Sequence, residues 1–484
     1  MSACKARVVL GVPNSRWLGK RSWNVFPYAA LILTALLKDE YEFSILDANG
    51  LDLSEEAYRS RIRELQPEAL LVTGGSVEYH QQAHRAVSLA REACPAVVTV
   101  LGGVYPTTLP EAAVAHEDLD WAFMYHAEDR IGAFLRLLLT GQVEAARAFP
   151  GVAFRAADGK LVENPLRERI GDIPVQCQPD YSLVDLAPYL RQESLDYQFN
   201  SDRLAAFIIT SYGCPYDCVF CASRTIAGRK PALRPVADVL GEIGYLTGRY
   251  GVGSLIFLDD NLLIPRARFR ALLDGLVSRH PGLIWKAASV SAWHLDAELL
   301  ELMRRSGCVQ LTVSVESGSQ RVLNEVIGKP LRLETVPPLV AECRRLGIAV
   351  GANFVIGTPG ETWDEIRETF RFADDCDFDV AHFHVSTPLP RTELHRICMR
   401  EGYLPKDFSF TDPRFFGFGQ GFITTPEFTP FELAVARAFE WDRINFKTPQ
   451  RVARMARLYQ ATPEEMTEHR RQTRRRLGLY DASA

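Results

Sequence analysis

The sequence has no apolar run long enough to cross a membrane. Its longest, from Val25 to Leu37, falls short of the roughly 20 residues that a spanning helix needs. The N-terminus lacks the pattern of a signal peptide and leads directly into an apolar, strand-like stretch. There is also no excess of positive charge, because the formal net charge is -5. These absences predict a cytoplasmic protein with neither a membrane nor a nucleic acid as its partner.

A dinucleotide-binding fingerprint is missing too. No G-x-G-x-x-G occurs in the 484 residues, so nothing in the sequence supports a nicotinamide cofactor. The composition is otherwise that of a globular chain with a real core, at 47% hydrophobic and 24% charged residues. A chain of this length favours about three domains. The cysteines, 10 in number and without a secretion signal, favour a reducing compartment in which thiols stay free.

One loop holds three cysteines in the sequence YGCPYDCVFC, directly after the strand-like residues 204–210. Cys214, Cys218 and Cys221 have the spacing C-x3-C-x2-C. Three thiolates on one loop can hold three irons of a cubane cluster and leave the fourth open, whereas closed clusters and structural zinc sites use four ligands. No fourth Cys or His follows at a closing spacing, and the next Cys downstream is Cys308. The spacing therefore predicts an open [4Fe-4S] cluster; three buried or zinc-binding cysteines are the alternative.

Residues 1–150 alternate between strand-like and helical patterns, which predicts a doubly wound parallel sheet. Ligands of such sheets bind beyond the carboxyl ends of the strands. Two pairs of glycines, at residues 74–75 and 102–103, fall at such ends, where a missing side chain lets a ligand approach the backbone. Ordinary turns explain the same glycines equally well.

The rest of the chain divides into three further parts. Residues 151–203 form a connector that begins with a hairpin. Residues 204–400 continue the alternation with six β/α units, which predicts a partial TIM-type barrel open on one side. Residues 401–484 form a small, mostly helical domain that caps the barrel or contributes to a substrate site. Its aromatic segment, residues 408–422, either selects a bulky substrate or packs as irregular core. The fold class is therefore α/β, a Rossmann-like domain followed by a partial (β/α)6 barrel.

The cysteine loop, with the aromatic Phe220 between its last two cysteines, resembles the radical S-adenosylmethionine (SAM) superfamily. The segments FLDDN, VESGSQRVL and FVIGTPGET extend this resemblance over residues 205–400. The resemblance implies that SAM chelates the open iron. The residues that offer it acceptors, donors or close backbone approach are Phe220, Asp259, Asp260, Glu316, Ser317, Arg321 and Gly357. For each acidic residue a helix cap or a surface charge is the alternative. His384 and Tyr212 are the candidate catalytic residues, with His384 directed into the barrel.

The first 150 residues resemble the cobalamin-binding domain that precedes the barrel in cobalamin-dependent radical SAM enzymes. The likeness lies in Pro27 with its apolar helix, in Leu46-Asp47, in residues 73–76 and in residues 101–106. It implies cobalamin as a cofactor. The implied contacts are Thr73, Gly74, Ser76, Gly102, Gly103, Tyr105 and Glu128. No D-x-H-x-x-G occurs, so a His that ligates cobalt from below has no counterpart here.

Together these parts resemble the cobalamin-dependent radical SAM methyltransferases, and ESGSQRVLNEVIGKPL resembles the phosphonate C-methyltransferase branch. The resemblance implies that a 5'-deoxyadenosyl radical abstracts hydrogen and that the substrate takes methyl from methylcobalamin, at carbon or phosphorus of a natural-product intermediate. It also implies a small-molecule substrate and an external one-electron reductant of the flavodoxin or ferredoxin type. Two alternatives stay open: the same cofactors performing cyclisation, ring contraction or hydroxylation, and a non-catalytic cluster or cobalamin sensor.

Overall fold

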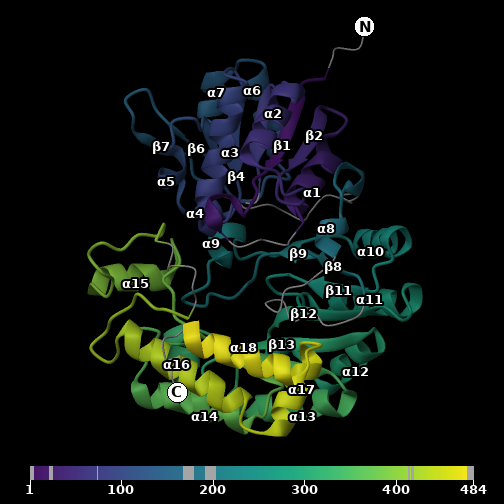
Figure 1. Ribbon diagram of the computed structural model, residues 1–484, viewed down its shortest axis with the longest axis vertical. Coiled ribbons are helices and arrows are strands. Elements are labelled where there is room, and N and C mark those ends of the chain that lie inside the picture. The colour runs from purple at the N-terminus through teal and green to yellow at the C-terminus, as the bar shows by residue number, and fades with distance from the viewer. Residues whose placement is uncertain are drawn as a thin grey trace. The chain divides into compact units, whose positions relative to one another are not determined.

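The computed structural model describes residues 5–20, 26–73, 75–166, 179–190, 203–412, 415 and 419–476. The chain forms two compact units, which Figure 1 colours by residue number. Unit 1 comprises Met1–Arg191 and Thr225–Ile243, and unit 2 comprises Gln192–Arg224 and Gly244–Ala484. Helices α9 (Ser223–Ala227) and α10 (Val236–Tyr250) each begin in one unit and end in the other.

Unit 1 contains a seven-stranded sheet in the order β2-β1-β3-β4-β5-β6-β7. Its strands are β1 Arg7–Val12, β2 Glu42–Asp47, β3 Ala69–Val72, β4 Val98–Gly102, β5 Trp121–Phe123, β6 Val152–Arg155 and β7 Leu161–Glu163. Strands β1 to β5 are parallel, and the order reverses at β1, as in doubly wound sheets. The hairpin expected after residue 150 is β6 and β7, which extend the same sheet antiparallel.

The helices of unit 1 follow the strands, and local signals explain where they begin. Pro27 directly precedes α1, and the Ser54 hydroxyl accepts a hydrogen bond from the backbone N–H of Ala57 at the start of α2. Apolar side chains of the sheet pack with those of α1 and α6 to form the core. The helices are α1 Tyr28–Leu37, α2 Glu55–Leu65, α3 His80–Ala93, α4 Val104–Thr108, α5 Pro110–Val114, α6 Ile131–Leu139, α7 Val143–Arg147 and α8 Ala187–Leu190, with short 3-10 turns at η1 Trp17–Gly19, η2 Val77–Tyr79 and η3 Tyr181–Leu183. The short strand β10 (Ala232–Leu233) also belongs to unit 1.

Unit 2 contains a six-stranded parallel sheet in the order β15-β14-β13-β12-β11-β8. Its strands are β8 Ala205–Ile208, β11 Ser254–Phe257, β12 Ile284–Val290, β13 Cys308–Glu316, β14 Ala349–Ile356 and β15 Val380–Val385, and a short β9 (Ser211–Tyr212) follows β8. The helices are α11 Arg266–Arg279, α12 Ala297–Arg305, α13 Val336–Leu346, α14 Trp363–Asp375, α15 Glu393–Glu401, α16 Pro430–Asn445, α17 Pro449–Leu458 and α18 Pro463–Arg476, with shorter turns at η5 Ala292–His294, η6 Val322–Ile327 and η7 Leu333–Thr335. The six predicted β/α units are therefore present, and β8 and β15 are the two edges of the sheet. In the ranges given above, no helix is both long and apolar enough to span a membrane.

The two faces of this sheet differ in chemistry. Phe383 of β15 packs on Phe370 of α14, so the helices cover the face to which Phe383 points. Since side chains alternate along a strand, its neighbours His382 and His384 point to the opposite, inner face. Ser314 and Asn353 are in register with His382 and share that face. The inner face of the barrel is therefore polar, as a ligand site requires.

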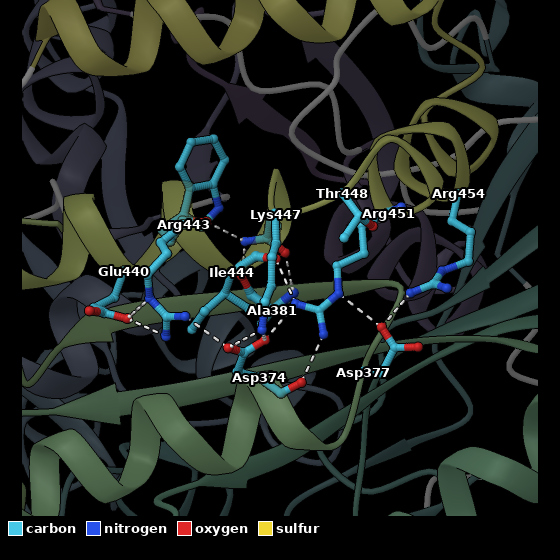
Figure 2. Close-up of polar contacts among 12 residues, drawn as sticks. Asp374, Asp377, Ala381, Glu440, Arg443, Ile444, Lys447, Thr448, Arg451 and Arg454 are labelled. Atoms are coloured by element: carbon cyan, nitrogen blue, oxygen red, sulfur yellow. Dashed lines mark hydrogen bonds and ion pairs between the residues drawn. The ribbon is translucent and has the colours of Figure 1, made fainter.

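The C-terminal helices are attached to the barrel by an ion-pair network (Figure 2). Asp374, at the end of α14, lies among three cations from α16, α17 and the loop between them: Arg443, Lys447 and Arg451. The Arg451 guanidinium also donates to Asp377, with Nε 2.9 Å from the carboxylate. Because Asp374 and Arg451 are both almost buried, this pair fixes α17 on the barrel more firmly than a surface ion pair does.

Candidate active site

The cysteine loop follows β8 and β9 at the carboxyl edge of the six-stranded sheet. Within the loop, the backbone N–H of Cys221 donates to the carbonyl of Cys218 at 2.9 Å. Val219 anchors the loop on two sides, since its N–H donates to Ile327 at 3.0 Å and its carbonyl accepts from Leu394 at 2.9 Å. The Val219 side chain is buried in an apolar cluster with Leu394. These contacts hold the three thiols of the loop at one place on the sheet edge.

Without a metal, the thiols of Cys218 and Cys221 favour the protonated state. Burial is the main cause that raises the pKa of Cys218 to about 12 and that of Cys221 to about 11. A bound metal ion reverses this preference, because it deprotonates the thiols that ligate it. The described residues contain no group of three His, Cys, Asp or Glu arranged around a single ion. In a cubane each sulfur binds a different iron, so the sulfurs of Cys214, Cys218 and Cys221 do not need to converge on one point.

An asparagine that the sequence analysis did not single out contacts this loop. The Asn261 side-chain amide donates to Cys214 Sγ at 3.7 Å and to Ser291 Oγ at 3.1 Å. A metal-bound thiolate only accepts hydrogen bonds, so the NH2 group of Asn261 must face the sulfur. Its Oδ1 is buried and has no hydrogen-bond partner within the described chain. The signal was present in the segment FLDDN, whose third polar residue is Asn261.

The two aspartates before Asn261 shape the backbone that leads into the cysteine loop. The buried Asp259 carboxylate accepts hydrogen bonds from Thr210 Oγ1 and Ser211 Oγ, both at 2.6 Å. Burial raises its pKa, and these hydrogen bonds act in the opposite direction. Asp260 accepts from the backbone N–H of Gly213 at 2.7 Å. The structure thus gives both residues protein partners, and their contact with SAM stays a prediction.

Glu316, at the end of β13, combines backbone strain with a buried charge. Its φ is +73°, a conformation that costs energy in a residue other than glycine and is frequent at functional sites. Its carboxylate accepts from Lys329 Nζ at 2.8 Å, and both side chains are nearly buried. Lys329 also lies over the Trp293 ring at 5.3 Å. Both charges act on the Cys218 thiol, so the Glu316–Lys329 pair lies beside the cysteine loop.

Two other predicted SAM ligands have partners from α14. The buried Ser317 hydroxyl lies 3.2 Å from Thr369 Oγ1. The Arg321 guanidinium donates to both carboxylate oxygens of Glu365 at 2.7 Å. An exposed arginine held in this way has to exchange partners before it can bind the carboxylate of SAM, and the role predicted for Arg321 is untested.

Gly357 packs against the side chain of Leu433, whereas the sequence predicted SAM at this glycine. A Cβ at this position would lie 2.3 Å from Leu433 Cδ1, and the φ of Gly357 is +80°. Close packing of α16 therefore accounts for the glycine. Its backbone N–H donates to Glu361 Oε2 at 2.7 Å, while Oε1 of the same buried carboxyl has no partner within the described chain. Burial raises the pKa of Glu361 to about 8.

The remaining predicted residues of unit 2 lie near the same edge. His384 is on the inner face of β15, and burial lowers its pKa, so the ring is neutral at pH 7. Tyr212 ends β9, two residues before Cys214. Phe220 packs against the apolar cluster that anchors the cysteine loop. The structure thus places all three around the cysteine loop and the polar inner face, and their roles in catalysis and cofactor binding stay predictions.

In unit 1 the predicted residues gather at the carboxyl ends of β3 and β4. Gly75 and Gly103 lie so close that a Cβ on Gly103 would be 3.0 Å from the Gly75 nitrogen. Contact between the two loops thus explains these glycines without a ligand. Tyr105 is buried, and its N–H donates to the Gly75 carbonyl at 2.5 Å. Thr73 fits a ligand best, because its Oγ1 is buried and has no partner within the described chain.

The other predicted cobalamin contacts have local roles or lie outside the described residues. Ser76 accepts from the backbone N–H of Glu78. Gly102 is the last residue of β4. Glu128 accepts from the N–H of Ala127 at 2.9 Å. Gly74 lies outside the described residues. The orphaned Thr73 hydroxyl at a strand end is therefore the observation of this structure that fits a bound cofactor.

Comparison with known proteins identifies the barrel. Residues 208–373 match the radical SAM superfamily. The chain therefore contains a radical SAM domain. The match includes the cysteine loop, Asp259, Asp260, Glu316 and Gly357, and it confirms the resemblance seen in the sequence.

Relatives of this chain include two that cover much of its length. Cytidylyl-2-hydroxyethylphosphonate methyltransferase of Streptomyces wedmorensis is 27% identical over 83% of this chain and 80% of its own. Anaerobic magnesium-protoporphyrin IX monomethyl ester cyclase of Rubrivivax gelatinosus is 27% identical over 72% of this chain and 61% of its own. One of these names describes methyl transfer, and the other describes ring closure.

Solved structures show that the fold extends beyond the barrel. The radical SAM methyltransferase TsrM from Kitasatospora setae, with cobalamin and a [4Fe-4S] cluster bound, is 19% identical with a TM-score of 0.70, over 97% of this chain and 99% of its own. OxsB, with aqua-cobalamin and SAM bound, is 15% identical with a TM-score of 0.71, over 97% of this chain and 72% of its own. The predicted α/β architecture is confirmed, and these two neighbours hold the three cofactors predicted from the sequence.

Proposed function

We propose that this chain is a cobalamin-dependent radical SAM methyltransferase that methylates a carbon or phosphorus centre of a small-molecule natural-product intermediate. The observation that carries the proposal is the loop of Cys214, Cys218 and Cys221 at the carboxyl edge of a polar, six-stranded barrel, beside the strained Glu316. The likeness to a phosphonate methyltransferase over most of both chains supports methyl transfer as the outcome.

The residues divide between holding cofactors and shaping their surroundings. The three cysteines hold the cluster and leave one iron for SAM. When bound, the cluster supplies the electron that cleaves SAM, and cobalamin supplies the methyl group. Asn261 orients the sulfur of Cys214, and Glu316 offers SAM a carboxylate whose position Lys329 fixes. In unit 1 the carboxyl ends of β3 and β4, with Thr73, hold cobalamin.

The proposal includes the surroundings predicted from the sequence. The enzyme works in the cytoplasm on a small molecule, draws electrons from a flavodoxin or ferredoxin, and binds no nucleic acid. Its four parts are residues 1–150 for cobalamin, 151–203 as connector, 204–400 as the radical SAM core and 401–484 as the capping and substrate domain.

The proposal is tested by anaerobic reconstitution with iron, sulfide and hydroxocobalamin, followed by desalting. We expect about four irons and one corrin per chain, with iron lost in Cys218→Ala and retained in the control Cys94→Ala, whose thiol lies outside the loop. Incubation with methyl-labelled SAM and a reductant then yields 5'-deoxyadenosine and a labelled product with the correct substrate. A chain that binds the cluster and no corrin contradicts the methylcobalamin part of the proposal.

A non-methylating reaction with the same cofactors is the second candidate, because the relative from Rubrivivax gelatinosus is named a cyclase. The labelled-SAM experiment separates the two candidates. Consumption of substrate with release of 5'-deoxyadenosine and no label in the product favours cyclisation or another rearrangement. A non-catalytic sensor releases no 5'-deoxyadenosine at all.

A further inference from the structure

Arg437 is a half-buried cation that has no carboxylate partner among the described residues. It lies on α16, and its Nε donates to the backbone carbonyl of Phe383 on β15 at 2.5 Å. No carboxylate of the described residues pairs with its guanidinium, in contrast to Arg443 on the same helix, which binds Asp374 and Glu440. Arg437 is half-buried, and this burial lowers the pKa of its guanidinium. A cation in this position favours an anion from outside the chain.

The guanidinium binds the backbone of β15 next to two histidines of the polar inner face. Phe383 lies between His382 and His384, whose rings are stacked with centroids 6.5 Å apart. Burial lowers the pKa of His382 to about 3 and also lowers that of His384, and the charge of Arg437 contributes to both shifts. At neutral pH both rings are therefore uncharged, and each can donate one N–H. The positive charge at this place belongs to Arg437 alone among these three side chains.

The backbone at Gly419 and Gly421 packs closely against Arg437 and the end of β15. A Cβ on Gly419 would lie 2.8 Å from Arg437 Nη1, and a Cβ on Gly421 would lie 2.7 Å from Val385 Cγ1. A side chain at either position would therefore require Arg437 or Val385 to shift. The segment contributes backbone at these two positions and no acidic side chain, so it covers the cation without neutralising it.

Arg437 and His384 lie at β15, which belongs to the same six-stranded sheet as the strand that precedes the cysteine loop. His384 lies near the carboxyl end of β15, and Leu394, which follows that strand, donates through its backbone N–H to the Val219 carbonyl of the cysteine loop at 2.9 Å. Glu316 is itself neutralised by Lys329, so it does not balance the charge of Arg437.

We propose that Arg437, together with His384, binds an anionic group of the substrate, a phosphonate, phosphate or carboxylate. A guanidinium presents a planar fork of donors that matches such oxyanions, and the neutral imidazole adds one further N–H. Anchoring the charged end of the substrate on α16 and β15 directs the remainder toward the cluster. This inference rests on the proposed function and names the class of its substrate.

The test measures binding of phenylphosphonate and of benzoate to the anaerobically reconstituted holoenzyme by calorimetry. We expect wild type to bind at least one of them, Arg437→Gln to weaken that binding about tenfold or more, and Arg437→Lys to weaken it less because the charge remains. His384→Gln is a second variant with a smaller loss. Arg400→Gln, which removes an exposed arginine of α15 paired with Glu401, is the control and leaves binding unchanged.

The outcomes separate this inference from the proposed function. The stronger of the two ligands identifies the anion as phosphonate-like or carboxylate-like. Wild type that binds neither ligand, or Arg437→Gln that binds as wild type does, overturns the anionic subsite while iron and corrin loading still support the methyltransferase. Iron and corrin content are measured on every variant. If Arg437→Gln fails to load them, the binding of Arg437→Lys and His384→Gln compared with wild type decides instead.

Discussion

Replacing Asp374 with Asn removes the charge that holds the C-terminal helices on the barrel while keeping the shape of the side chain (Figure 2). The exposed partners contribute little: Arg443 and Lys447 are 46% and 50% exposed, and such pairs are each worth about 0–1 kcal/mol. Arg451 is only 10% exposed and decides the magnitude, because a buried charge left without its partner costs about 3–5 kcal/mol. Since Arg451 keeps Asp377 as a second acceptor, we expect a loss of about 2–4 kcal/mol.

Hydrogen exchange followed by mass spectrometry measures this loss locally, on peptides from residues 430–458. Where exchange proceeds by local opening, a loss of about 2–4 kcal/mol speeds it about 30- to 900-fold. Asp375→Asn is the matched control, since Asp375 is the exposed neighbour and forms no ion pair or hydrogen bond with the described residues. Equal protection of α16 and α17 in Asp374→Asn and wild type refutes the reasoning, and so does an equally large effect of Asp375→Asn.

The same network predicts a dependence on pH. Burial acts to raise the pKa of Asp374, but hydrogen bonds from Lys447, Arg443 and Arg451 outweigh it and lower the pKa to about 2. The carboxyl of unfolded Asp titrates at about 3.9. A depressed pKa contributes stability that is complete above the unfolded value and is lost as pH falls through the folded value. The difference between wild type and Asp374→Asn therefore stays constant from about pH 7 to about pH 5 and shrinks between about pH 4 and about pH 2.

Two further predictions concern the residues beside the cluster. Lys329→Met leaves Glu316 buried and unpaired, so the free energy of unfolding of unit 2, measured in urea, falls by about 3–5 kcal/mol. The double variant with Glu316→Gln regains part of this stability. A Lys329→Met variant as stable as wild type contradicts the buried pair. Asn261→Leu removes the hydrogen bond to Cys214 Sγ, so the reconstituted cluster has a more negative midpoint potential in an EPR-monitored redox titration, and an unchanged potential shows that the contact does not act on the cluster.

The sequence by itself determined the cluster loop and the two α/β layers. C-x3-C-x2-C is a local pattern, so the proximity of Cys214, Cys218 and Cys221 follows from chain connectivity alone. The alternation of strands and helices is equally local, and this is why six β/α units and their polar strand ends were predictable. Glu316 was singled out because it directly follows an apolar strand, although its strained φ was not visible in the sequence.

Only the tertiary structure decided which side chains meet across the chain. Asn261 reaches Cys214 from the next strand of the sheet, and Arg437 reaches the backbone of β15 from a helix more than 50 residues downstream. Packing also gives protein neighbours to two residues that the sequence assigned to SAM: Arg321 is held by Glu365, and Gly357 makes room for Leu433. Contacts of this kind depend on where helices dock on the sheet, and no spacing along the sequence encodes that choice.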